Sequence, residues 1–228
     1  MDLNVFMDAY FKRVVPHLSG VVQPEKAIAD IWTATKAMIA SEDAQRSNEQ
    51  VFKEVFFADA ELKEEVLWPI FENFYANAFG DLITFTQPSP LARQICDAAL
   101  AKGYQLAVAT NPIFPEMAIR HRLNWAGVGD VPFALVTTME NMHFCKPNPK
   151  YYMEILEMLG VSADEAMMFG NDVQEDGVAG KVGMKTFLVT DNLIDNQRGD
   201  FTFDYTGSLA QALEFVRQLP KVGDYASA

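Results

Sequence analysis

Apolar side chains in the first third of the chain recur every three to four residues, which is the period of an amphipathic helix. A polar break follows at residues 17–23, and Pro24 stands where a second helix would begin. Further helices are predicted at residues 49–57 and 60–79. The many aromatic residues here also follow helical spacing. We therefore interpret them as the interior of a small helical bundle rather than as a cofactor pocket.

From residue 80 onward the pattern changes to short apolar runs that alternate with helical stretches. This alternation is typical of an α/β fold with a doubly wound, parallel, Rossmann-like sheet. We expect two domains, one helical at residues 1–80 and one α/β at residues 81–228. Strands are predicted at residues 104–110, 133–137, 166–169 and 185–190, with the run at 166–169 buried on both faces of the sheet.

Composition narrows the classes of function. Half of the 228 residues are apolar, which is ample for a sizeable core and argues against disorder. The formal net charge is −13 and no basic run occurs, so we expect neither nucleic acid nor membrane as a partner. We find no secretory signal and no apolar run of membrane-spanning length. Cys96 and Cys145 fit reduced thiols, and we expect a cytoplasmic protein.

Polar residues stand where the predicted strands end. Thr110 and Asn111 end one strand, Asp172 follows another, and Lys146 lies just before a helix whose first turn contains two prolines. Asp176 comes four residues after Asp172, on the same side of a first helical turn. Because the carboxyl ends of parallel strands meet at one edge of a sheet, we expect these side chains to converge there.

These residue types together suit a phosphoryl group and a metal ion. Two carboxylates held close repel one another unless a cation lies beside them, and Mg²⁺ prefers oxygen ligands. A hydroxyl, backbone N–H groups and an ammonium make a phosphate cradle. Ordinary alternatives exist: Thr110 as a strand-end hydroxyl satisfied by backbone, Lys146 as a surface lysine, and Asp172 as a helix cap.

The same stretches resemble three motifs of the haloacid dehalogenase (HAD) superfamily of phosphohydrolases. Residues 106–111 are similar to the second motif, Lys146 in Cys-Lys-Pro-Asn-Pro to the third, and residues 170–176 to the acidic fourth. Their order and approximate spacing match over residues 82–190. The helical residues 3–79 take the place of the family's helical cap.

The resemblance implies a cytosolic, Mg²⁺-dependent phosphatase of a small phosphorylated metabolite that works through an aspartyl-phosphate. Dehalogenation and phosphoryl transfer between metabolites are not excluded, and the oligomeric state stays open. The implied roles are phosphoryl binding for Thr110 and Asn111, charge neutralisation for Lys146, Mg²⁺ binding for Asp172 and orientation of the metal shell for Asp176.

The family's first motif, a strand ending Asp-x-Asp-Gly-Thr that carries the nucleophile, has no counterpart here, so we expect the first core strand to be missing. Its place is mid-sheet, between the strands ending at Thr110 and Phe169, where its loss leaves two rows of unpaired backbone groups. Either the intact protein has further N-terminal residues, or this is a degenerate, non-catalytic member that binds phosphate, metal or a partner. The retained residue types favour the first explanation. In both cases we expect little activity from the 228-residue chain.

Overall fold

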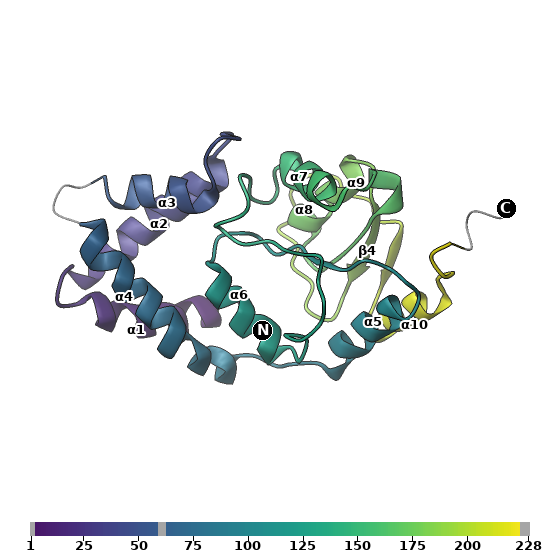
Figure 1. Cartoon of the computed structure of the whole chain (residues 1–228), viewed down its shortest axis with the longest axis horizontal. Helices are drawn as coiled ribbons and strands as arrows, with labels where there is room; N and C mark the ends of the chain where they lie inside the picture. Colours follow the sequence, from purple (N-terminus) through teal and green to yellow (C-terminus); the bar gives the residue numbers. More distant parts are fainter. Residues whose placement is uncertain (1–2, 59–62, 224–228) are drawn as a thin grey trace. The chain divides into compact units, whose positions relative to one another are not determined.

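The computed structural model describes residues 3–58 and 63–223, which form two compact units (Figure 1). Unit 1 comprises Met1–Pro88, Asn111–Trp125 and Thr138–Cys145. Unit 2 comprises Ser89–Thr110, Ala126–Thr137 and Lys146–Ala228. The division into a cap at residues 1–80 and a core at residues 81–228 stays a prediction, since unit 1 also takes in two later segments.

Unit 1 is built from helices, as the periodicity predicted. Pro24 occupies the first turn of its helix, and Ser47 and Gln50 form a capping box at the start of another, which satisfies backbone N–H groups there. The predicted helix start at residue 60 lies outside the described residues. The elements are α1 (Leu3–Leu18), α2 (Pro24–Ala40), α3 (Asn48–Phe56), α4 (Glu64–Asn77), the 3₁₀ helix η1 (Phe79–Phe85) and α6 (Glu116–Trp125).

Most of the aromatic residues of unit 1 lie in its interior, as we predicted. Phe79 is fully buried, and its ring stacks on that of Trp125 with centroids 5.4 Å apart. Tyr10, Phe74 and Tyr75 surround the same ring at 5.4–6.4 Å. Each buried phenylalanine contributes about 1.5–3 kcal/mol through removal of apolar surface from water. The helices of unit 1 therefore pack around an aromatic cluster centred on Phe79.

Unit 2 has the predicted alternation of strands and helices, and all of its strand pairs are parallel. Figure 1 shows α5 and α10 on one side of β4 and α7, α8 and α9 on the other, as a doubly wound fold requires. The elements are α5 (Pro90–Leu100), β1 (Ala107–Val108), β2 (Leu135–Val136), α7 (Pro149–Leu159), η2 (Ala163–Glu165), β3 (Met167–Gly170), α8 (Val173–Asp176), α9 (Val178–Lys181), β4 (Lys185–Val189), β5 (Tyr205–Gly207) and α10 (Leu209–Gln218).

The strands form two sheets, β1–β2 and β3–β4–β5, rather than one continuous sheet. The expectation that residues 166–169 are buried on both faces is wrong: Met168 is buried, but its strand neighbours are only half-buried. The reason is that β3 pairs with β4 alone among the described residues. Strands β1 and β2 are also shorter than predicted, at two residues each.

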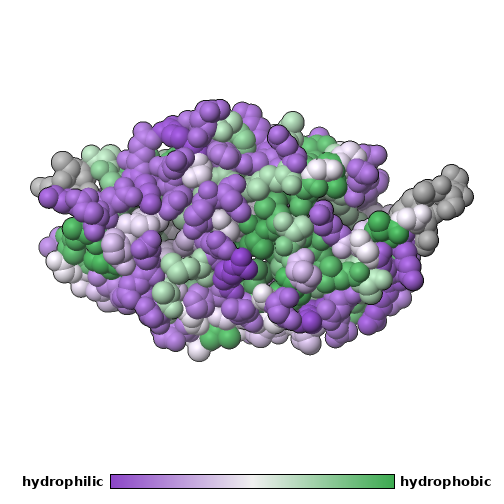
Figure 2. All heavy atoms as spheres, viewed as in Figure 1, coloured by the Kyte–Doolittle hydropathy of each residue, from purple (hydrophilic) through white to green (hydrophobic). Residues whose placement is uncertain are grey.

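Hydrophilic residues predominate on the face of the molecule shown in Figure 2, with hydrophobic residues in scattered patches. Single exposed apolar side chains such as Val5 and Met153 are normal for a folded protein. Within the described ranges, none of the helices combines the length and the apolar character that crossing a membrane would require.

We expect Phe79→Ala to lower the free energy of unfolding by about 3–5 kcal/mol, because it opens a cavity at the centre of the aromatic cluster. Phe85→Ala, in the same 3₁₀ helix but 39% exposed, is the matched control and should cost less than about 1 kcal/mol. Urea unfolding followed by circular dichroism measures both. Equal costs for the two variants would contradict the proposed centre of the cluster.

Candidate active site

Lys146 and Asp176 form a buried ion pair in unit 2. Lys146 Nζ lies 2.6 Å from Asp176 Oδ1, and the two side chains are only 5% and 7% exposed. The ring centroids of Tyr151 and Tyr152 lie 5.7 and 5.8 Å from the same nitrogen, which adds cation–π attraction. Lys146 is therefore not a surface lysine. A buried ammonium costs free energy unless a negative partner offsets it, and Asp176 is that partner.

The second oxygen of Asp176 binds the loop that carries Asp172. The backbone N–H of Asp172 donates to Asp176 Oδ2 at 3.0 Å. Asp172 Oδ1 in turn accepts the backbone N–H groups of Gln174 and Glu175 at 2.9 and 2.8 Å, so Asp172 also caps α8. Its other carboxylate oxygen makes no hydrogen bond to the residues that the structure describes. The two carboxylates therefore have different surroundings: Asp176 is buried and paired, whereas Asp172 keeps one oxygen available to a ligand.

Gly170, at the end of β3, allows Asp176 to lie where it does. A Cβ atom at residue 170 would come within 2.1 Å of Asp176 Oδ2, far inside van der Waals contact. The loop is also anchored from outside, since the N–H of Ile194 donates to Asn171 O and the N–H of Val173 donates to Ile194 O, at 2.8 and 2.9 Å. Sequence analysis included Gly170 only as part of the stretch 170–176, because its close approach to Asp176 is set by the fold.

Thr110 is tied to the same cluster through Tyr151. The Tyr151 hydroxyl donates to Thr110 O at 2.8 Å, and Thr137 Oγ1 donates to the same oxygen at 2.9 Å. Tyr151 thereby contacts both the segment that follows β1 and the ammonium of Lys146. Sequence analysis missed Thr137 and Tyr151, although Thr137 ends a predicted strand and Tyr151 lies in the helix that follows Lys146.

The five predicted site residues are divided between the units. Thr110, Lys146, Asp172 and Asp176 belong to unit 2 and are linked by the contacts described above. Asn111 belongs to unit 1, where its carbonyl oxygen accepts the N–H of Ile113 at 2.9 Å. Four of the five therefore lie in one unit, where Thr110 is linked to the others through its backbone carbonyl oxygen.

Tyr152 lies beside the ion pair as a hydrogen-bond donor. Burial, followed by the negative charge of Asp176, raises the pKa of the Tyr152 hydroxyl far above its ordinary value. The hydroxyl donates to Glu175 O at 2.8 Å. It stays protonated at any physiological pH, so Tyr152 cannot serve as a general base and instead holds α8 against α7.

The donor atoms fit a single-carboxylate Mg²⁺ site. No cluster of three or more His, Cys, Asp or Glu side chains occurs within residues 3–58 and 63–223. Mg²⁺ does not need one, because it keeps several waters and binds one or two carboxylates together with phosphate oxygens. Asp172 can supply such a ligand. The charge of Asp176 is already offset by Lys146, and its expected role in orienting the metal shell stays a prediction.

Comparison with families and curated proteins gives a consistent set of relatives. The family model described as haloacid dehalogenase-like hydrolase matches residues 8–183. A phosphoglycolate phosphatase of Aquifex aeolicus is 29% identical over 163 residues, which cover 67% of this chain and 74% of the relative. A phosphoglycolate phosphatase of Rhodospirillum rubrum is 29% identical over 117 residues, 51% of this chain and 47% of the relative.

Solved structures share the fold at low sequence identity. An HAD phosphatase from Thermococcus onnurineus superposes with a TM-score of 0.55 at 23% identity, covering 96% of this chain and 92% of that one. The L-2-haloacid dehalogenase of Xanthobacter autotrophicus superposes with a TM-score of 0.53 at 17% identity, covering 92% and 94%. At these identities the likeness concerns the fold alone.

Breaking the buried pair from either side should be costly. We expect Lys146→Met and Asp176→Asn each to lower the free energy of unfolding by about 3–5 kcal/mol, because each leaves an uncompensated buried charge. The double variant should lose less than the sum of the two. Denaturant unfolding measures this, with the exposed pair Arg93–Asp130 as control, where single substitutions should cost less than about 1 kcal/mol. If the double variant lost as much unfolding free energy as the two single variants together, Lys146 and Asp176 would not interact.

Gly170→Ala should destabilise unit 2 by about 1–3 kcal/mol, because its methyl group has to displace the Asp176 carboxylate. Gly180→Ala is the matched control. A Cβ there would lie 3.5 Å from Thr186 Cγ2, an ordinary contact, so this change should be neutral or stabilising by up to about 1 kcal/mol. Thermal unfolding of the two variants measures the difference in stability. Equal melting temperatures would contradict the close approach of residue 170 to the Asp176 carboxylate.

Proposed function

Because the chain belongs to the haloacid dehalogenase-like hydrolases, we propose that it forms the phosphate-binding part of a phosphatase acting on a small phosphorylated metabolite. One observation carries the proposal: a buried ammonium–carboxylate pair, Lys146–Asp176, stands beside the available carboxylate of Asp172. Asp172 and Asp176 follow the carboxyl end of β3, and Lys146 contacts Asp176. Open α/β sheets bind their ligands at this edge.

Each residue has a role in this proposal. Thr110 holds phosphoryl oxygens, and Lys146 neutralises negative charge on the phosphoryl group. Asp176 fixes the position of the Lys146 ammonium through the 2.6 Å contact. Asp172 is the residue that would hold Mg²⁺, and the metal would supply further charge neutralisation at the phosphoryl oxygens. Phosphatases of this family generally use a divalent metal, which supports this assignment.

Phosphoryl chemistry is favoured over dehalogenation by the curated relatives. Both are named phosphoglycolate phosphatase. A phosphorylated small molecule is therefore the substrate class we propose, and a cytoplasmic location is part of the same proposal. The carboxylate that would attack phosphorus and form the aspartyl-phosphate is not among the motifs of this sequence, which contains no Asp-x-Asp.

A second function is a non-catalytic phosphate- or partner-binding protein. The absence of Asp-x-Asp favours it, and so does the division of the described strands of unit 2 into two separate sheets. The Lys146–Asp176 pair fits both functions, because binding a phosphate also needs a positioned ammonium.

Activity assays distinguish the two functions. The 228-residue chain should hydrolyse phosphoglycolate and 4-nitrophenyl phosphate at only a background rate, because losing a covalent nucleophile costs about 10⁴-fold or more. A protein extended at its N-terminus by a strand ending Asp-x-Asp-Gly-Thr should hydrolyse these esters faster by about that factor. Chelation of Mg²⁺ should return the rate to background. In the extended protein, Lys146→Met should return the hydrolysis rate to background. Lys185→Met, at an exposed lysine, should leave the rate unchanged.

Two outcomes would contradict the phosphatase. Ordinary enzymatic rates from the 228-residue chain would show that the nucleophile is assigned wrongly. An extended, folded protein that binds inorganic phosphate in a Lys146-dependent way without hydrolysis would favour the binding protein.

A further inference from the structure

Unit 1 contains a cavity of about 200 Å³ among its helices. Eight of the fourteen residues that line it are aromatic, and none of these fourteen carries a formal charge. The aromatic residues come from α1 to α4 and from the segment before α6. The interior of the helical bundle is therefore not completely filled by its own side chains.

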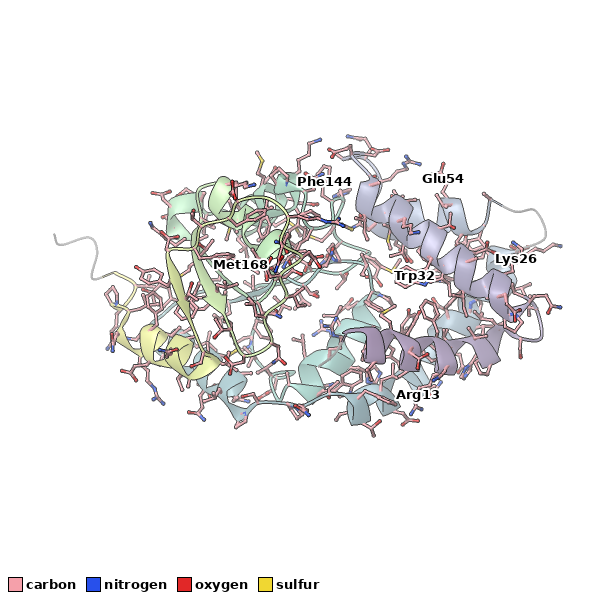
Figure 3. The ribbon with its side chains drawn as sticks, turned by 180° about the vertical axis from the view of Figure 1, so that it is seen from behind. Arg13, Lys26, Trp32, Glu54, Phe144 and Met168 are labelled. Atoms are coloured by element: carbon pink, nitrogen blue, oxygen red, sulfur yellow. The ribbon has the colours of Figure 1, made fainter. Side chains whose placement is uncertain are left out.

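Trp32 is the most exposed of the residues that line the cavity. This residue of α2 lines the cavity and is also 40% exposed to solvent. Figure 3 shows Trp32 on the side of α2 that faces α1, and its ring centroid lies 5.6 Å from that of Phe11. A large aromatic side chain that touches both solvent and an apolar cavity provides a path by which a small molecule can enter.

The few polar groups of the lining are satisfied within the protein and uncharged. The hydroxyls of Tyr10 and Tyr75 lie 2.9 Å apart and bond to each other, and Thr35 Oγ1 donates to Ile31 O at 2.8 Å. Burial raises the pKa of Tyr10 to about 12, and that of Tyr75 also rises, so both hydroxyls stay neutral. No group in the lining can offset the charge of a carboxylate or a phosphate.

The size and chemistry of the cavity specify its ligand. A dry, apolar protein cavity of about 150 Å³ is large enough to bind benzene. Keeping such a volume empty forfeits dispersion contacts that a ligand would restore. Aromatic rings in the wall offer both faces and edges to a ring, the two geometries in which aromatic pairs attract.

We propose that this cavity is a binding site for a small, uncharged aromatic compound of one or two rings. The site lies entirely within unit 1 and does not depend on the proposed phosphatase activity.

Indole provides a direct test, because the three tryptophans act as built-in reporters. Trp32 and Trp68 line the cavity, whereas Trp125 stacks on Phe79 outside it. In protein labelled with 5-fluorotryptophan, ¹⁹F NMR should show saturable shifts of the Trp32 and Trp68 resonances and none of Trp125. Indole-3-carboxylate has the same ring with a negative charge and should cause no shift at the same concentrations.

Two threonines of α2 provide matched variants. Thr33 and Thr35 each donate a hydrogen bond to the carbonyl four residues earlier, at 2.8 Å, but Thr33 faces solvent and Thr35 lines the cavity. Thr35→Leu places extra volume in the cavity and should weaken indole binding about tenfold or more. Thr33→Leu should leave it unchanged.

Three results would overturn the proposal: no saturable shift with indole, equal shifts at Trp125, or equal indole affinity of the Thr35→Leu and Thr33→Leu proteins. Circular dichroism of both variants checks that they fold. If Thr35→Leu fails to fold, the unsubstituted chain still tests the proposal. Indole has to shift the Trp32 and Trp68 resonances, and indole-3-carboxylate must not.

Discussion

The structure of unit 2 depends on one buried electrostatic contact, the 2.6 Å pair between Lys146 and Asp176. Removing two opposite charges from water costs several kcal/mol per ion, which their attraction offsets only when the geometry is good and the remaining polar atoms are bonded. Here the backbone N–H of Asp172 satisfies the second carboxylate oxygen, and two tyrosine rings face the ammonium. The loop after β3 and the start of α7 have to meet this requirement together.

This requirement also explains residues with no chemical role of their own. Gly170 is needed because no side-chain atom fits between β3 and the Asp176 carboxylate. Tyr151 joins the segment that follows β1 to the ammonium, since its hydroxyl donates to Thr110 O and its ring lies beside Lys146. A phosphoryl group bound at this edge would find a positive charge that is already held in place, so little side-chain entropy remains to be lost on binding.

The two units offer different chemical environments. Unit 2 presents a buried ion pair and a partly available carboxylate, which suit charged oxygen-rich ligands. The cavity of unit 1 is lined by aromatic and aliphatic side chains, and its hydroxyls are bonded within the protein. Helical spacing predicted that the aromatic residues form an interior, and most of them do. The spacing of apolar residues indicates which face of a helix is buried. It does not indicate how completely the side chains of neighbouring helices fill the space between them, so the cavity could not be predicted.

The sequence alone determined the elements and the kinds of residue at their ends, because helix period, strand alternation and caps are local properties of the chain. It thereby predicted the α/β class and the helical first part, and it identified Thr110, Lys146, Asp172 and Asp176 as candidate site residues. Only the tertiary structure decided which of these meet. Lys146 and Asp176 are thirty residues apart, and no local pattern records their approach. The division into two sheets and the half-burial of β3 likewise depend on which strands pair, and pairing is set by long-range contacts.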